Sequence, residues 1–113
     1  MGTKLTGVAS AVESQWIVGR VKADVKALNN WEGYWIDGER NTSTSDFVWT
    51  DGYTTGNSAL DSSNAEFSYK DHLWTEDENC LIAAKFPNSQ TINDVSCNNA
   101  IGVWGAVCGY QLN

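Results

Sequence analysis

A capped amphipathic segment near the start of the chain constrains its fold most strongly. Ser10 and Glu13 have the spacing of a capping box, in which two side chains satisfy exposed amide groups at a helix start. Apolar residues then recur in a stripe about 100° wide, as on a helix that buries one face. This stripe consists of Ile17, Val18, Val21, Val25 and Leu28. We therefore expect a helix that begins after Ser10, buries this face and ends near Asn29-Asn30.

The hydrophobic period changes after this helix. Residues 33–38 and 47–52 are short aromatic or β-branched runs that each close with Asp-Gly, which predicts two short strands. Residues 51–77 then keep no period of either kind. Because an ordered loop of this length inside a compact domain is usually functional, the sequence predicts the binding surface there.

Alternation over residues 80–86 and 104–112 predicts two further strands. The residues that share a face are Cys80, Ile82, Ala84 and Phe86 in the first strand, and Trp104, Ala106, Cys108, Tyr110 and Leu112 in the second. Both Cys80 and Cys108 are therefore expected to point into the core.

The six tryptophans divide into two groups. The five in or beside predicted elements are expected to fill the core, as large aromatics do; they are Trp16, Trp31, Trp35, Trp49 and Trp104. Trp74 stands in the long loop among polar residues. An exposed aromatic there would stack on a sugar or anchor a protein contact, and the alternative is that it packs the loop onto the domain.

Composition and motifs exclude several classes of function. With 113 residues the chain suits a single domain. A net charge of −7 and the absence of any basic cluster argue against a nucleic-acid or anionic-membrane partner, and no apolar run approaches the roughly 20 residues of a membrane span. The only histidine is His72, and the sequence has no C-x-x-C or G-K-S/T motif. We therefore expect no enzyme.

Six short motifs follow one another in an order that is similar to C-type lectin-like domains, most closely the secreted nematode-type forms. They are LTGVAS, YWIDG, FVWTDG, ENC, INDVSC and AVCGY, and the resemblance runs from about Leu5 to the C-terminus. It implies an α+β fold with small antiparallel sheets, at least one helix and a long loop that carries the ligand site. It also implies an extracellular, secreted location, although LTGVASAV does not read as a signal peptide.

The resemblance also concerns the cysteines. It implies a disulfide between Cys80 and Cys97, and a second one from Cys108 to a cysteine of a first helix that this sequence lacks. Residues 1–113 are therefore expected to form a single C-type lectin-like domain without the family's first strand and first helix. Cys108 would be unpaired, and the last strand would lose its partner, so Cys108 or the exposed edge could pair with another chain.

A calcium site is the family property that the sequence matches least well. Sugar-binding members hold calcium with a Glu-Pro-Asn or Gln-Pro-Asp triplet, a glutamate two residues before a cysteine, and an Asn-Asp pair. Glu78, Asn93 and Asp94 match the last two elements, and SYKDHLW stands where the triplet would be. Even with Asp71 added, this set falls short of about 6 to 8 oxygen ligands. We expect no cofactor or weakly bound calcium, with Asn93 and Asp94 shaping an Asx-type turn and Glu78 solvated.

These observations predict a non-catalytic extracellular recognition module that binds a glycan or protein ligand through its long loop, without a complete calcium site. Asp71 and Trp74 are the candidate ligand-binding residues, and Glu78, Asn93 and Asp94 are the candidate metal ligands. The alternative is a calcium-dependent carbohydrate-binding lectin with a degenerate site. A third possibility is a truncated product without independent activity.

Overall fold

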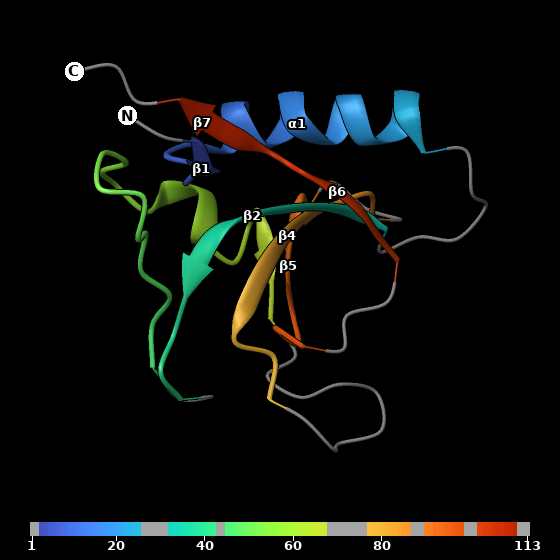
Figure 1. The fold of residues 1–113 in the computed structure, drawn as a ribbon. Helices are drawn as coiled ribbons and strands as arrows, with labels where there is room; N and C mark the ends of the chain where they lie inside the picture. Colours follow the sequence, from blue (N-terminus) through green and yellow to red (C-terminus); the bar gives the residue numbers. More distant parts are fainter. Residues whose placement is uncertain are drawn as a thin grey trace.

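The structure, a computed structural model, describes residues 3–25, 32–42, 45–67, 77–86, 90–98 and 102–110. Its helices and strands follow one another in the order shown in Figure 1. They are β1 (Thr3–Leu5), α1 (Ala11–Asp24), β2 (Gly33–Glu39), η1 (Ser58–Leu60), β3 (Ala65–Glu66), β4 (Cys80–Ala84), β5 (Ile92–Val95), β6 (Val103–Ala106) and β7 (Cys108–Tyr110). The predicted combination of helix and small sheets, an α+β arrangement, is confirmed.

Helix α1 begins where the capping residues place it. The Ser10 hydroxyl accepts a hydrogen bond from the Glu13 amide at 3.3 Å, and the Glu13 carboxylate accepts from the Ala9 amide at 3.2 Å. The helix ends at Asp24, before the predicted Asn29-Asn30, because the backbone of Val25 is already extended. Val25 thereby buries its side chain in the core even though it lies beyond the helix. Residues 26–30, which include Leu28, lie outside the described part of the chain.

The strands form two sheets. β1 and β7 are an antiparallel pair, and the other five strands lie side by side in the order β3-β5-β4-β2-β6. In this larger sheet β4 is antiparallel to β2 and β5, whereas the β2–β6 and β3–β5 pairs are parallel. The expected antiparallel pairing is therefore present in the β1–β7 sheet and on both sides of β4, whereas the larger sheet as a whole is mixed. Parallel neighbours need a long crossover connection, and most of the chain separates β2 from β6.

The core lies on both faces of the five-stranded sheet. α1 packs its buried face on one side, near the place where β1 meets β7 (Figure 1). That cluster includes Ile17, Val18, Ile36, Leu81 and Ala83. The other cluster comprises Ile82, Ala84, Phe86 and Val95, with Trp35, Cys80 and Val103 packed against it. The shared face predicted for residues 80–86 is therefore confirmed.

The predicted strand 104–112 differs from the structure. It divides at Val107 into β6 and β7, and Val107 packs against the core. Trp104 is 63% exposed and Cys108 is also exposed, so the expected core positions of these residues are wrong. Apolar residues occupy both faces of this segment, so its sequence does not distinguish the inward face from the outward one. A shift of one residue along a strand moves every side chain to the opposite face. Leu112 and the side chain of Tyr110 lie outside the described residues.

The expectation that the last strand lacks a partner is wrong for the edge that faces β1. Leu5 lies opposite Cys108, and Lys4 lies opposite Gly109. The Thr6 amide extends this contact by donating to the Val107 carbonyl at 2.9 Å.

Residues 47–52 do not form the predicted strand, because only one bridge, between Glu39 and Val48, is made there.

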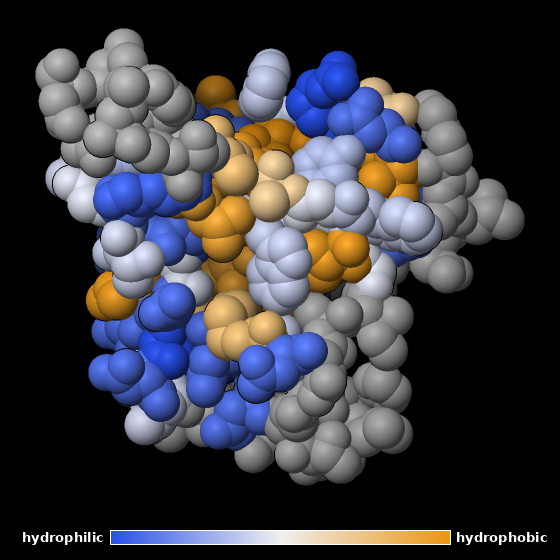
Figure 2. Space-filling model, in the orientation of Figure 1, coloured by the Kyte–Doolittle hydropathy of each residue, from blue (hydrophilic) through white to orange (hydrophobic). Residues whose placement is uncertain are grey.

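The expected core position of Trp16 is wrong, because this residue is 69% exposed on the outer face of α1. Trp35 and Trp49 are half-buried, whereas Trp31 and Trp74 lie outside the described residues. Figure 2 shows hydrophobic residues reaching the surface at the centre of one face, with hydrophilic residues below them.

Candidate functional site

Two buried aspartates, Asp37 and Asp51, accept the hydrogen bonds that hold the first turn of the long loop in place. Asp37 accepts hydrogen bonds from the Thr50 hydroxyl at 2.5 Å and the Asp51 amide at 2.9 Å. Asp51 in turn accepts from the Gly7 amide at 2.7 Å, the Tyr53 amide at 3.0 Å and Thr54, whose amide lies at 2.9 Å. The loop is thereby tied both to β2 and to the segment before α1.

Asp51 remains charged in this environment. Its burial raises the pKa, but the hydrogen bonds from Thr54, Gly7 and Tyr53 favour the carboxylate and together lower the pKa to about 2. Asp51 therefore acts as a fixed anionic acceptor for the backbone of the turn.

The described half of the long loop contains regular structure, contrary to the sequence prediction. It includes η1 and β3, and Asn64 between them bonds to the Ala59 carbonyl at 2.8 Å and the Ser14 hydroxyl at 3.0 Å. The Thr91 hydroxyl donates to the Asn64 side chain at 2.8 Å. This buried network joins the loop to α1 and to the start of β5, so residues 51–67 form a scaffold rather than an unstructured stretch.

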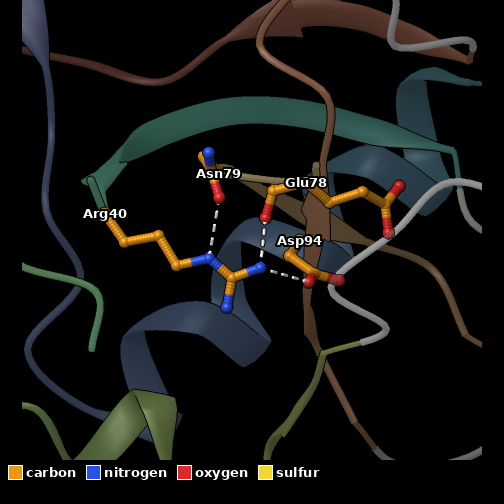
Figure 3. Close-up of polar contacts among 4 residues, drawn as sticks. All are labelled: Arg40, Glu78, Asn79 and Asp94. Carbon is orange, nitrogen blue, oxygen red and sulfur yellow. Dashed lines mark hydrogen bonds and ion pairs between the residues drawn. The ribbon is translucent and has the colours of Figure 1, made fainter. Parts of the chain in front are cut away.

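A buried guanidinium lies at the centre of the region that the sequence assigns to calcium. Arg40, just after β2, donates through Nη2 to the Asp94 carboxylate at 3.2 Å and to the Glu78 carbonyl at 2.5 Å, and through Nε to Asn79 Oδ1 at 3.0 Å (Figure 3). The guanidinium carbon also lies 4.5 Å from the centre of the Phe47 ring. Both side chains of the Arg40–Asp94 ion pair are excluded from solvent, with 1% and 0% exposure.

The three candidate metal ligands are placed differently from the expectation. Asp94 is committed to Arg40, and Glu78 offers Arg40 its carbonyl while its carboxylate points away from the guanidinium (Figure 3). Asn93 is half-buried within β5, opposite Ile82 of β4. Because Asn93 and Asp94 lie inside a strand, the predicted Asx turn is wrong, and Glu78 is half-buried rather than simply solvated.

No group of three or more histidine, cysteine, aspartate or glutamate side chains that could hold a metal occurs in the part of the chain that the structure describes. The ligand candidates Asp71 and Trp74 lie outside that part.

The predicted disulfide is confirmed. Cys80 and Cys97 are bonded, with their Cα atoms 5.1 Å apart, so β4 is linked to the segment that follows β5. A polar pocket of about 360 Å³ lies beside this bond and includes Asp77, Asn79 and Ser96 in its lining. Cys108 is free and exposed.

A larger pocket, of about 400 Å³, lies between the segment after β2 and the described half of the long loop. We call it the long-loop pocket; the lining residues that matter most are Arg40, Asp46, Phe47, Asn57, Asp61 and Phe67. Its apolar floor includes the rings of Phe47 and Phe67, whose centres are 5.0 Å apart. Asp46, Asn57 and Asp61 are exposed and give it a polar rim.

Sequence reasoning missed Arg40 and the acidic rim of this pocket. One signal was available for Arg40, which is one of two arginines and lies just after a predicted strand. In an acidic chain, a carboxylate that becomes buried needs a cation as its partner, and few arginines are available to serve as one. No local pattern indicates that Asp46 and Asp61 line one pocket, because η1 and the turn before Phe47 meet only in the folded chain.

In the part of the chain that the structure describes, helix α1 on a mixed sheet and the Cys80–Cys97 bond form an α+β arrangement. The sequence model of the Lectin C-type domain matches residues 1–109, and the chain therefore belongs to the C-type lectin domain family. No curated protein and no solved structure matches the chain. C-type lectin domains are generally non-catalytic modules that recognise carbohydrate or protein, and they are typically extracellular or secreted. Among the described residues, no helix has the length and apolarity of a membrane span.

Proposed function

We propose that this chain is an extracellular recognition module that binds a glycan or protein ligand through the long-loop surface without calcium. The observation that carries this proposal is the buried ion pair between Arg40 and Asp94. In the folded domain the guanidinium stands beside the carboxylate that matches a calcium ligand of sugar-binding relatives.

Two physical reasons make this arrangement unfavourable for calcium. An arginine stays protonated at all ordinary pH values, so a divalent cation bound to Asp94 would lie close to a fixed positive charge. Calcium also needs several oxygen ligands, and one Asp94 oxygen and the Glu78 carbonyl already accept hydrogen bonds from Arg40.

The positively charged guanidinium also holds neighbouring segments together, as a bound cation at this place would. Its donors connect the end of β2, the segment before β4 and strand β5. A planar group with several fixed donors is well suited to holding three segments at once. Support for the ligand-site surface would therefore come from the chain itself and would not depend on calcium concentration.

The long-loop pocket is the ligand site that we favour. A pocket of about 400 Å³ falls in the range of about 300 to 1,000 Å³ that is typical of small-ligand sites. Its aromatic floor and polar rim suit a sugar residue or a protein side chain with one apolar side and several polar groups.

A glycan array probed with the labelled domain in calcium and in EDTA tests this proposal. We expect the same set of bound glycans under both conditions, with a calcium-dependent lectin on the same array losing its signal in EDTA. Loss of this chain's binding in EDTA would favour the alternative, a calcium-dependent lectin.

Calorimetric titration of calcium gives an independent measurement. We expect binding no tighter than roughly millimolar, the weak end for extracellular calcium modules. Micromolar binding that Asp94→Asn abolishes would contradict the proposal, provided that circular dichroism shows the variant to be folded.

A further inference from the structure

Among the described residues that line it, the long-loop pocket carries two carboxylates and one guanidinium, which is already paired. Asp46 and Asp61 on its rim are exposed, and neither forms an ion pair with another described residue. The side chain of Asp61 accepts one long hydrogen bond, from Ser62 at 3.5 Å. The basic residue in the described lining is Arg40, whose charge is committed to the buried Asp94. The rim is therefore anionic.

The floor of the pocket offers an apolar surface. Phe47 is almost fully buried, and its ring already has the Arg40 guanidinium near it at 4.5 Å. Phe67 is half-buried and tilted by 44° to Phe47, and Leu60 is half-buried beside them. A ligand with one apolar face can therefore rest on Phe67 and Leu60 while its polar groups meet the rim.

The neutral polar groups of the rim differ in their availability. The Ser58 hydroxyl donates to the Ala9 carbonyl at 3.0 Å, and the Ser45 hydroxyl is paired with that of Thr42 at 2.8 Å. The side chain of Asn57 makes no capping hydrogen bond to η1, although Asn57 occupies the capping position. Asn57 can therefore both donate and accept toward a ligand hydroxyl.

From these features we propose that the long-loop pocket selects an amino sugar, a hexose ring that carries a free, protonated amine. This inference rests on the proposed function and deepens it. The ammonium group lies between Asp46 and Asp61, the apolar face of the ring packs on Phe67 and Leu60, and a ring hydroxyl meets Asn57.

The chemistry favours this ligand over two others. An anionic sugar would face two carboxylates and a chain of net charge −7. A lysine side chain would satisfy the carboxylates but would offer no hydroxyl to Asn57, and its thin stem would fill a pocket of about 400 Å³ poorly.

The test is a series of NMR titrations of the intact chain with glucosamine, glucose, N-acetylglucosamine and glucuronic acid. At about pH 6, where the amine is protonated, we expect glucosamine to bind most tightly and glucuronic acid not to bind. Acetylation removes the charge, so N-acetylglucosamine should behave like glucose. Raising the ionic strength should weaken glucosamine binding and leave glucose unaffected.

Two isosteric variants locate the site. We expect Asp46→Asn and Asp61→Asn each to weaken glucosamine binding roughly three- to fivefold, the size of an exposed charge pair, with glucose binding unchanged. Asp24→Asn, the same chemical change on α1 outside the pocket, is the matched control and should have no effect.

The outcomes separate this inference from the function on which it rests. Equal binding of glucosamine and glucose, or equal affinity in Asp46→Asn and the wild type, would overturn the amino-sugar assignment while leaving a calcium-independent module intact. Tighter binding of a lysine peptide than of glucosamine would also overturn it. Ligand binding that appears only with calcium would instead contradict the proposed function.

Discussion

Replacing Arg40 by methionine should destabilise the domain strongly. Methionine keeps an apolar stem of similar length but removes the charge and the hydrogen bonds to Asp94, Glu78 and Asn79. Asp94, which has no solvent exposure, would then lose the guanidinium that offsets its charge. Breaking a buried pair in this way costs about 3 to 5 kcal/mol, a large share of the roughly 5 to 15 kcal/mol that stabilises a typical domain.

This free energy translates into a clear thermal shift. For a chain of 113 residues, each kcal/mol lowers Tm by about 4 °C, so the expected decrease is roughly 12 to 20 °C. Equilibrium unfolding in urea, followed by tryptophan fluorescence and circular dichroism, measures the same change as a lower midpoint with an unchanged slope.

A second variant makes the reasoning testable. Adding Asp94→Asn to Arg40→Met removes the remaining buried charge, so the double variant should be more stable than the sum of the single effects predicts. We expect a coupling free energy of about 2 kcal/mol between the two positions. Strictly additive effects, or a cost for Arg40→Met below about 1 kcal/mol as for an exposed pair, would refute the role assigned to this ion pair.

Three other positions give sharp expectations. Asp51 has a folded pKa of about 2, below its unfolded value of about 3.9. Its contribution of about 2 kcal/mol to the free energy of unfolding is therefore complete above about pH 4 and is lost as the pH falls toward 2. The urea midpoint of Asp51→Asn should lack this pH dependence. Reduction of the Cys80–Cys97 bond, 17 residues apart, should cost about 3 kcal/mol, seen in melts with and without a thiol reductant. Asn64→Ala should cost about 1 to 3 kcal/mol in urea unfolding, because it removes the buried hydrogen bonds to the Ala59 carbonyl, the Ser14 hydroxyl and the Thr91 hydroxyl. A loss below about 0.5 kcal/mol would contradict the network.

The sequence by itself determined the elements that local chemistry specifies. Ser10 and Glu13 fixed the helix start, since a cap acts within one turn. Alternation over residues 80–86 predicted which side chains of β4 share a face, because successive residues of a strand point to opposite sides. The order of the motifs indicated the family and, with it, the Cys80–Cys97 pairing.

The tertiary structure alone decided where a local pattern was ambiguous. The segment 104–112 is apolar on both faces, so its own alternation does not determine which side chains point toward the core. The packing of Val107 against the core set that choice. The helix end depended similarly on the core position of Val25. In each case burial against distant residues selected one of two locally acceptable arrangements.

The candidate site was the least predictable part, because its contacts join residues far apart in sequence. Arg40 and Asp94 are 54 residues apart, and neither has a neighbour in sequence that reveals the pairing. Asp46 and Asp61 share a pocket only because η1 folds back toward the segment after β2. Local pattern specifies caps and strand faces through interactions within a few residues, whereas a buried charge is tolerated only where the fold supplies its partner, and that partner is chosen by the three-dimensional packing of the chain.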